Sequence, residues 1–298
     1  MPNNSGNSKS SEAFHLDSKI LTEGTLKDVN RPLSLGAYLT ELWNRREFVF
    51  VDAKVKAFRT TRNYRWWRFW LVASPVLEAL LYGAIFGLLL RTSRGVDNFV
   101  GFVIIGMTVF AVVSRMLQGG FGLLEANRPF LQTFRFPQAA IVLSNSIRYA
   151  IDTAPSFYIA VVAAIAFQPG QPPRWTLLLA VPLHVLVLVF GTGLMFASAR
   201  LTASIPDSRA LLDLFVRGWM FASGIFYPLE RFATDGRVYQ IFLNNPAYRF
   251  IDAIRLAVMD GVAPTIGEWG YLAAWSFGAL LVGLVYFWIG EAKYAASL

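Results

Sequence analysis

Long apolar runs separated by short polar segments dominate the chain from residue 69 onward. Because an α-helix needs about 20 apolar residues to cross about 30 Å of hydrocarbon, each long run predicts a membrane-spanning helix. We therefore expect an all-α integral membrane protein whose transmembrane domain covers residues 61–290. Its six expected transmembrane helices are residues 69–90, 98–117, 137–167, 175–203, 210–227 and 271–290.

The segment before these runs has a different pattern. Residues 1–33 are polar and rich in Ser, Asn and Lys, which is typical of a disordered tail. Over residues 34–60, apolar side chains such as Leu35 and Tyr38 recur at helical spacing among basic ones. This pattern predicts an amphipathic helix that lies in the membrane interface, and residues 291–298 are expected to form a short tail.

Residues 228–262, between the fifth and sixth runs, contain two apolar pieces that are too short to span. Asn245 is a suitable N-cap with Pro246 at the first helical position, and Asp252 and Arg255 mark a polar face of the helix that follows. Since backbone at membrane depth needs helical hydrogen bonds, we expect a re-entrant helical hairpin on the outer side. An ordinary outer loop is the alternative.

Composition supports the membrane assignment, and charge orients the spans. Hydrophobic residues make up 55% of the chain and charged residues 15%, and the formal net charge is +8. The first 69 residues contain twelve Lys and Arg against seven Asp and Glu. The positive-inside rule therefore places both termini in the cytoplasm.

Motifs for covalent, metal or nucleotide chemistry are absent from the sequence. There is no cysteine, the two histidines His15 and His184 are far apart, and no G-x-x-x-x-G-K-[ST], G-x-S-x-G or H-E-x-x-H occurs. We expect no catalytic residue, no metal site and no nucleotide site in this chain. His184, alone in the fourth run, is expected to be a hydrogen-bonded packing residue rather than a proton relay.

Five charged residues fall inside the expected spans: Glu78, Arg148, Asp152, Asp213 and Arg217. A charge at the bilayer centre costs about 2.5–3.5 kcal/mol, so each should face protein or water. Arg148 with Asp152, and Asp213 with Arg217, are four residues apart and could pair within a helix or line a polar pathway. Glu78 has no partner in its own run and is expected to contact Arg148 or Arg217.

Four arginines, Arg59, Arg62, Arg65 and Arg68, recur every three residues beside aromatic residues. One guanidinium group can donate two parallel hydrogen bonds to phosphate oxygens. This pattern is therefore consistent with capture of an anionic lipid-linked substrate. Generic membrane anchoring is the alternative.

Aromatic residues also lie deep in the expected spans. Aromatic rings can stack on sugar faces, so they predict a pore lining, with lipid-facing packing as the alternative. The set is Tyr82, Phe86, Phe215, Trp219, Phe226 and Tyr227. The last four lie at offsets of 0, 4, 11 and 12 along the chain, which places them on roughly one helix face.

Several local sequences resemble the membrane subunit of ATP-binding-cassette exporters for O-antigen, teichoic acid, capsule and galactan. Residues 70–88 (WLVASPVLEALLYGAIFGL) are similar to that family's first span, and residues 124–137 (LEANRPFLQTFRFP) to its loop after the second span. Residues 224–228 (GIFYP) resemble the end of its fifth span, and Asn245-Pro246 followed by Arg255 resembles its outer hairpin.

This resemblance implies a homodimer that works with two copies of a separate ATPase, which would bind ATP and Mg²⁺; the chain itself would hold no cofactor. The substrate would be a cell-envelope polysaccharide on a polyprenyl pyrophosphate, and no nucleic acid would be involved. The arginines from Arg62 to Arg68 would contact the pyrophosphate. The outer gate would be Asn245, Pro246, Asp252 and Arg255. The ATPase would be contacted by Gly122, Leu124, Glu125, Asn127, Arg128, Asp207 and Arg209.

Two other functions are compatible with the sequence. One is a drug or small-molecule exporter of the same superfamily. The other is an ion-coupled secondary transporter or channel that uses Glu78, Asp152 and His184 and needs no ATPase.

Overall fold

A computed structural model describes residues 34–62, 73, 77, 81, 98–133, 137–168, 174–228 and 236–297. In this part of the chain every regular element is helical. The first helices are α1 (Leu35–Asn44), α2 (Arg46–Arg62), α4 (Phe99–Gly119), α5 (Leu123–Ala126), α6 (Arg128–Thr133) and α7 (Ala139–Ala166). They are followed by a 3₁₀ turn at Trp175–Leu179, α8 (Ala180–Ser204), α9 (Ser208–Ala222), α10 (Gly236–Leu243), α11 (Pro246–Arg255), a π-helical turn at Leu256–Asp260 and α12 (Ile266–Ser297).

Four described helices are long and apolar enough to cross a membrane: Phe99–Gly119, Ala139–Ala166, Trp175–Ser204 and Ile266–Glu291. They correspond to the second, third, fourth and sixth expected spans. The first expected span lies outside the described residues, apart from helical Ala73, Leu77 and Leu81. The six-span count therefore stays a prediction.

The fifth expected span is shorter than predicted. α9 ends at Ala222, and turns cover residues 223–227, where the sequence pattern predicted helix. Its 15 residues are about 22 Å long at about 1.5 Å per residue, less than the roughly 30 Å of hydrocarbon. Gly224 has a φ of +61°, a left-handed conformation that ends regular helix here.

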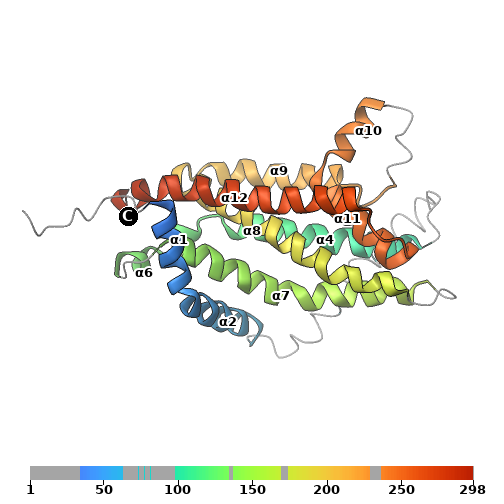
Figure 1. The fold of residues 1–298 in the computed structure, drawn as a ribbon, viewed down its shortest axis with the longest axis horizontal. Coiled ribbons are helices and arrows are strands. Elements are labelled where there is room, and N and C mark those ends of the chain that lie inside the picture. Colours follow the sequence, from blue (N-terminus) through green and yellow to red (C-terminus); the bar gives the residue numbers. More distant parts are fainter. Residues whose placement is uncertain are drawn as a thin grey trace, which may run out of the picture. The chain divides into compact units, whose positions relative to one another are not determined.

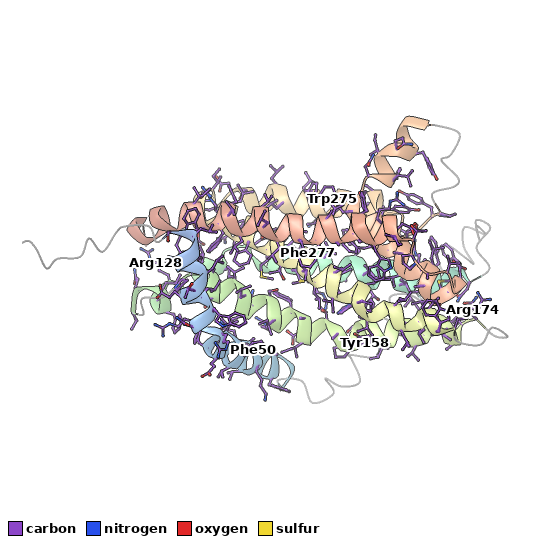
Figure 2. The ribbon with its side chains drawn as sticks, viewed as in Figure 1. Phe50, Arg128, Tyr158, Arg174, Trp275 and Phe277 are labelled. Atoms are coloured by element: carbon purple, nitrogen blue, oxygen red, sulfur yellow. The ribbon has the colours of Figure 1, made fainter. Side chains whose placement is uncertain are left out.

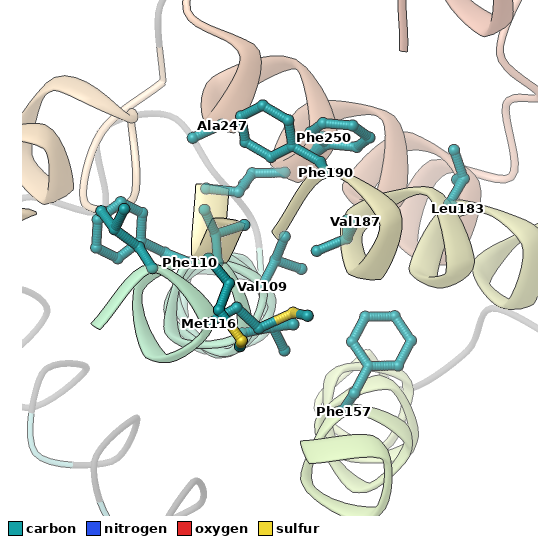
Figure 3. Packing of buried hydrophobic residues seen from close by; sticks show 14 of the residues in the cluster. Val109, Phe110, Met116, Phe157, Leu183, Val187, Phe190, Ala247 and Phe250 are labelled. Carbon is teal, nitrogen blue, oxygen red and sulfur yellow. The ribbon is translucent and has the colours of Figure 1, made fainter. Parts of the chain in front are cut away.

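The long helices pack side by side along their lengths. α12 lies along α8, α4 packs between α7 and α8, and α2 packs on α7 (Figure 1). α11 packs across α4. Their shared core is almost entirely apolar, and Figure 3 shows Met116, Phe157, Val187 and Phe250 entering it from α4, α7, α8 and α11.

Glycine allows α8 and α12 to approach closely. A Cβ at Gly193 would overlap the backbone of Ala279, and a Cβ at Gly283 would overlap the backbone of Gly193. Gly278, on another side of α12, faces open space. Small residues at such contacts are the usual means by which membrane helices pack tightly.

The expected amphipathic helix over residues 34–60 is two helices, α1 and α2, separated at Arg45. Ser34 caps α1 by accepting a hydrogen bond from the backbone N–H of Ala37. α2 buries Val49, Ala53 and Ala57 against the rest of the protein. The apolar side chains on its other side are exposed, including Phe50 (Figure 2), so α2 has one face for the protein and another that suits a lipid interface.

Candidate functional site: the two ends of the helices

The described helices have two distinct ends, which we name by their contents. At the Glu291 end α4 and α8 finish, α7 begins, and the apolar part of α12 stops at Glu291. At the hairpin end lie α10, α11 and the start of α12. In Figure 2, Arg128 is labelled at the Glu291 end and Arg174 at the hairpin end.

Tyr38 and Glu291 form a buried polar contact at the Glu291 end. The Tyr38 hydroxyl donates to Glu291 Oε2 and accepts from the backbone N–H of Ala139 at 3.2 Å. Glu291 Oε1 accepts from the backbone N–H of Gln138 at 2.8 Å. Burial, and then the Glu291 carboxylate, raise the pKa of Tyr38 above its ordinary value, so the hydroxyl stays protonated. The contact joins α1, the start of α7 and the end of α12.

Gly122 forms the tight turn between α4 and α5. Its φ is +62°, and its N–H donates to the hydroxyl of buried Thr202 on α8 at 3.2 Å. A Cβ at this position would lie 2.7 Å from Arg209 Nη2. Both the backbone conformation and the space therefore require glycine.

Arg209, at the start of α9, forms an ion pair with Glu125 on α5. The pair is part-exposed, with side-chain exposures of 38% and 48%. Of the other residues expected to contact an ATPase, Leu124 is buried, Asn127 ends α5, Arg128 begins α6, and Asp207 is exposed just before α9. Residues 122–128 thus form a turn at Gly122, the short helix α5 and a break at Asn127 before α6 begins.

Asn245 joins α9 to α11 at the hairpin end. Its Oδ1 caps α11 by accepting from the N–H of Ala247 at 3.1 Å, and it also accepts from Trp219 Nε1 at 2.9 Å. Its Nδ2 donates to the carbonyl oxygen of Ala222 at 2.8 Å. The expected cap is confirmed, together with Pro246 at the first helical position. Because one amide makes all these bonds, the end of α9 and the start of α11 are held together.

The sequence pattern predicted that Arg255 shares a polar face with Asp252, and this prediction was wrong. Arg255 is 4% exposed, and its guanidinium donates to the carbonyl oxygens of Phe102, Gly224 and Ile225 at 3.0 Å each. Arg255 points inward because its N–H groups donate to the carbonyls of Gly224 and Ile225, which the turn after α9 leaves free, and to that of Phe102 in α4. Asp252, one turn earlier, is half-buried beside a cavity.

The charges expected inside the spans are placed as follows. Arg148 and Asp152 pair within α7, with 3.4 Å between Nε and Oδ2. Asp213 accepts a hydrogen bond from Gln118 Nε2 of α4 at 3.1 Å instead of pairing with Arg217, which is exposed on α9. Glu78 lies outside the described residues, so its expected contact with Arg148 or Arg217 stays a prediction.

The four aromatic residues expected on one helix face are divided between a helix and a turn. Phe215 is 54% exposed on α9, and the rings of Phe215 and Trp219 lie 5.5 Å apart. Phe226, 3% exposed, and Tyr227 follow the end of α9, so the shared face was wrong. Tyr227 donates its hydroxyl to the carbonyl of Phe221, which keeps it at the hairpin end.

His184 is buried without the hydrogen bond that the sequence suggested. It is 3% exposed, and its ring lies 4.0 Å from that of Phe157 and 5.7 Å from that of Tyr158. Within the residues that the structure describes, neither ring nitrogen has a hydrogen-bond partner. The residue packs as an aromatic ring between α7 and α8.

The remaining predicted residues fall partly or wholly outside the description. Arg59 and Arg62 belong to α2 by their backbone, and nothing is described of their side chains. Arg65, Arg68, Tyr82 and Phe86 lie outside the described residues. No group of three or more His, Cys, Asp or Glu that could hold a metal occurs in the described part of the chain.

Sequence reasoning missed Tyr38, Glu291 and Thr202 as joints between helices. Helical spacing places Tyr38 on the apolar stripe of an interface helix, and the end of the last apolar run predicts a tail that begins at Glu291. The available signal was an acidic side chain directly after a long apolar run. That signal could not identify Tyr38, 253 positions earlier in the chain, as the hydrogen-bond partner of Glu291.

These features define an α-helical integral membrane protein whose helix ends carry the polar contacts. The chain belongs to the ABC-2 type transporter family, which matches residues 54–259. Three relatives are similar to this chain at low identity. The O-antigen export system permease protein RfbA of Myxococcus xanthus is 23% identical over 177 residues, 59% of this chain and 66% of that protein. The polysialic acid transport protein KpsM of Escherichia coli is 24% identical over 221 residues, 72% of this chain and 82% of its own length. The RfbA protein of Klebsiella pneumoniae is 24% identical over 214 residues, with coverages of 71% and 78%.

Proposed function

We propose that this protein is the membrane subunit of an exporter that moves a lipid-linked cell-envelope polysaccharide across the bacterial cytoplasmic membrane. ATP hydrolysis in a separate subunit would drive it. The observation that carries the proposal is the family match over residues 54–259, together with relatives that are an O-antigen export permease and a polysialic acid transport protein. The substrate is a polyprenyl-pyrophosphate-linked glycan, and this chain supplies the conduit.

Charge supports an orientation with the Glu291 end in the cytoplasm. Exposed basic residues gather there, among them Arg45, Arg46, Lys54 and Arg128. Under the positive-inside rule this end is cytoplasmic, and the hairpin end faces outward. Both termini are then inside, with residues 1–33 as a tail and residues 228–262 as an outer re-entrant hairpin.

The Gly122 turn is suited to receive force from an ATPase. It projects α5 at the proposed cytoplasmic face, and Gly122 contacts α8 through Thr202. Arg209 links α5 to α9 through Glu125. A partner that pushes on α5 therefore acts on two long helices at once. The proposed contact surface is Glu125, Asn127, Arg128, Asp207 and Arg209 around the Gly122 turn, whereas Leu124, which is buried, supports α5 from within.

α9 is suited to line a pore or a homodimer interface. Arg217 is exposed near its middle, beside Phe215 at 54% exposure. An arginine facing lipid at that depth would cost about 2.5–3.5 kcal/mol, so protein or water has to cover this face. A second copy of the chain would provide that cover and leave a polar, aromatic conduit between the copies. Arg59, Arg62, Arg65 and Arg68 would receive the pyrophosphate at the cytoplasmic entrance.

Affinity purification in mild detergent, followed by mass spectrometry, is the first test. We expect two copies of the chain with two copies of a nucleotide-binding ATPase and a bound polyprenyl-linked glycan. Depletion of the protein in its native host should leave that glycan in the cytoplasmic leaflet. A changed drug sensitivity with unchanged envelope glycan would instead indicate a small-molecule exporter. Transport by the isolated chain, driven by a pH gradient alone, would contradict the proposal.

The ion pair between Glu125 and Arg209 allows a direct test of coupling between this chain and the ATPase. A part-exposed pair contributes about 0–1 kcal/mol to stability, so breaking it should leave the fold intact. Glu125→Arg and Arg209→Glu should each lower glycan-stimulated ATP hydrolysis of the complex, and the double variant should recover part of it. Glu47→Gln, an exposed change on α2, is the control.

A further inference from the structure

A cavity of about 290 Å³ lies between α11 and the first turns of α12, at the hairpin end. Drug-sized ligands occupy pockets of about 300–1,000 Å³, so this cavity has room for one small molecule. It lies apart from the Gly122 turn and from the exposed face of α9. Its lining residues are Arg249, Asp252, Ala253, Thr265, Gly267, Glu268, Tyr271 and Leu272.

Arg249 presents hydrogen-bond donors at this cavity. Its Nε donates to the carbonyl oxygen of Leu243 at 3.0 Å, and its guanidinium carbon lies 5.5 Å from the centre of the Tyr271 ring. These two contacts fix the side chain. In the described part of the chain its two terminal nitrogens have no other partner, so they remain available to a ligand.

Glu268 and Tyr271 are fixed by their own hydrogen bonds. Glu268 Oε2 accepts from the N–H of Thr265 at 2.7 Å and from its hydroxyl at 3.0 Å, which forms a capping box at the start of α12. Glu268 Oε1 is not used in that box. The Tyr271 hydroxyl donates to the carbonyl oxygen of Asn244 at 3.1 Å, so the ring is held in place at the cavity.

The chemistry of the lining selects among ligand classes. Arg249 and Glu268 place one positive and one negative charge at the lining, so the cavity gives little net attraction to phosphate, sulfate or acidic sugars. Fixed donors, fixed acceptors and an aromatic ring beside Leu272 match a small neutral molecule with many hydroxyl groups and an apolar face. A neutral pyranose has these properties.

We propose that this cavity binds one neutral sugar residue of the exported glycan at the hairpin end. The source of the sugar rests on the proposed function, whereas the binding itself does not. A sugar held here would retain the emerging chain between successive steps of export.

Saturation-transfer NMR on the purified, detergent-solubilised protein tests the binding directly. The probes are the methyl glycosides of galactose, mannose, N-acetylglucosamine and rhamnose, with methyl glucuronide as the anionic counterpart. We expect at least one neutral glycoside to bind and the glucuronide to bind more weakly. Failure of all four neutral glycosides to bind, or preference for the glucuronide, would overturn the proposal.

Two matched variants localise the site. Tyr271→Leu removes the ring and should weaken binding about tenfold, whereas Tyr271→Phe keeps the ring and should bind nearly as well as the parent. Phe277→Leu, on the membrane-exposed side of α12, controls for loss of an aromatic residue from the same helix. Equal binding by Tyr271→Leu and the parent would overturn the assignment.

Glu268→Gln is an independent variant that should fold normally. Glutamine can complete the capping box, so thermal stability should stay unchanged. It lacks the negative charge that strengthens hydrogen bonds accepted by Glu268 Oε1, so sugar binding should weaken. Unchanged sugar binding in Glu268→Gln would count against the site.

Reconstituted export separates the two proposals. If the parent binds glycosides but its complex with the ATPase exports no glycan, the sugar site holds and the proposed function fails. If export occurs and no glycoside binds, the proposed function holds and the sugar site fails.

Discussion

Arg255 Nη1 donates to the carbonyl oxygen of Gly224 at 3.0 Å, and this bond joins α11 to the turn after α9. The same guanidinium reaches Ile225 and, on α4, Phe102, whose ring lies 3.3 Å from the guanidinium carbon. Gly106 provides the space, since a Cβ there would overlap Arg255 Nη2. With Asn245 bonded to Ala222, α11 is fixed to the end of α9 at two points. An outer gate built on α11 would therefore move together with α9.

Replacing Arg255 with methionine should strongly destabilise the protein. The buried turn carbonyls of Gly224 and Ile225 would lose their donor, and each unsatisfied group costs about 1–3 kcal/mol. We expect a fall of several degrees in the unfolding midpoint, measured by fluorescence-detected size exclusion after heating in detergent. Arg46→Met, at an exposed arginine on α2, should change the midpoint little. Similar midpoints for both variants would show that the three bonds contribute nothing.

The contrast between Arg255 and the long spans shows what the sequence could predict. Apolar runs require burial or lipid whatever their neighbours, so four of the six expected spans are present as helices within a few residues of their predicted bounds. The N-cap at Asn245 was also predictable, because capping depends only on residues close in sequence.

Arg255 and Tyr38 were misplaced because their partners are distant in sequence. Helical spacing assigned Arg255 to a polar face, whereas carbonyls of Gly224 and Ile225, freed by a turn that ends α9, draw it inward. The same turn removed Phe226 from the predicted aromatic face. Local periodicity has no information about backbone groups left unpaired elsewhere in the chain.

Tyr38→Phe should loosen α1 from the Glu291 end. The change removes the donor to Glu291 and the acceptor for the N–H of Ala139, at a cost of about 1–3 kcal/mol. We expect faster hydrogen–deuterium exchange in α1 and in the first turn of α7. Tyr158→Phe is the control, since its ring is part-exposed on α7 and no hydrogen bond of its hydroxyl is found in the described residues. Unchanged exchange in Tyr38→Phe would contradict the role of this contact.

Gly193→Ala should separate α8 from α12. The added methyl group would overlap the backbone of Ala279, which cannot move as a flexible side chain could. We expect a loss of about 1–3 kcal/mol, detected as a lower unfolding midpoint. Gly278→Ala, which faces open space on α12, should be neutral or slightly stabilising because alanine favours helix.

Gly122→Ala should weaken the turn that carries α5. Alanine is strained at a φ of +62° by about 1–2 kcal/mol, and its methyl group would press on Arg209. We expect reduced copurification of the ATPase from cells that express both subunits. Gly36→Ala, an exposed glycine in α1 with nothing near its Cβ position, is the control. Normal ATPase recovery with Gly122→Ala would argue against this turn as the docking element.

His184→Leu, unlike the destabilising changes above, should not lower the unfolding midpoint. Neither ring nitrogen of His184 is hydrogen-bonded within the described residues, so the folded state bears the cost of removing them from water, about 1–3 kcal/mol for an unpaired polar group. Leucine keeps the contact with Phe157 without that cost. We expect the unfolding midpoint to stay constant or rise.

Thr176→Val is the matched control for His184→Leu. It is also a buried polar-to-apolar change at the α8 side of the bundle, but the Thr176 hydroxyl donates to the carbonyl of Ala257 at 2.7 Å. Its loss leaves a buried carbonyl unpaired and should lower the midpoint. A clear destabilisation by His184→Leu, comparable with that of Thr176→Val, would mean that the imidazole is hydrogen-bonded in the membrane. The ion-coupled alternative, in which His184 carries protons, would then regain support.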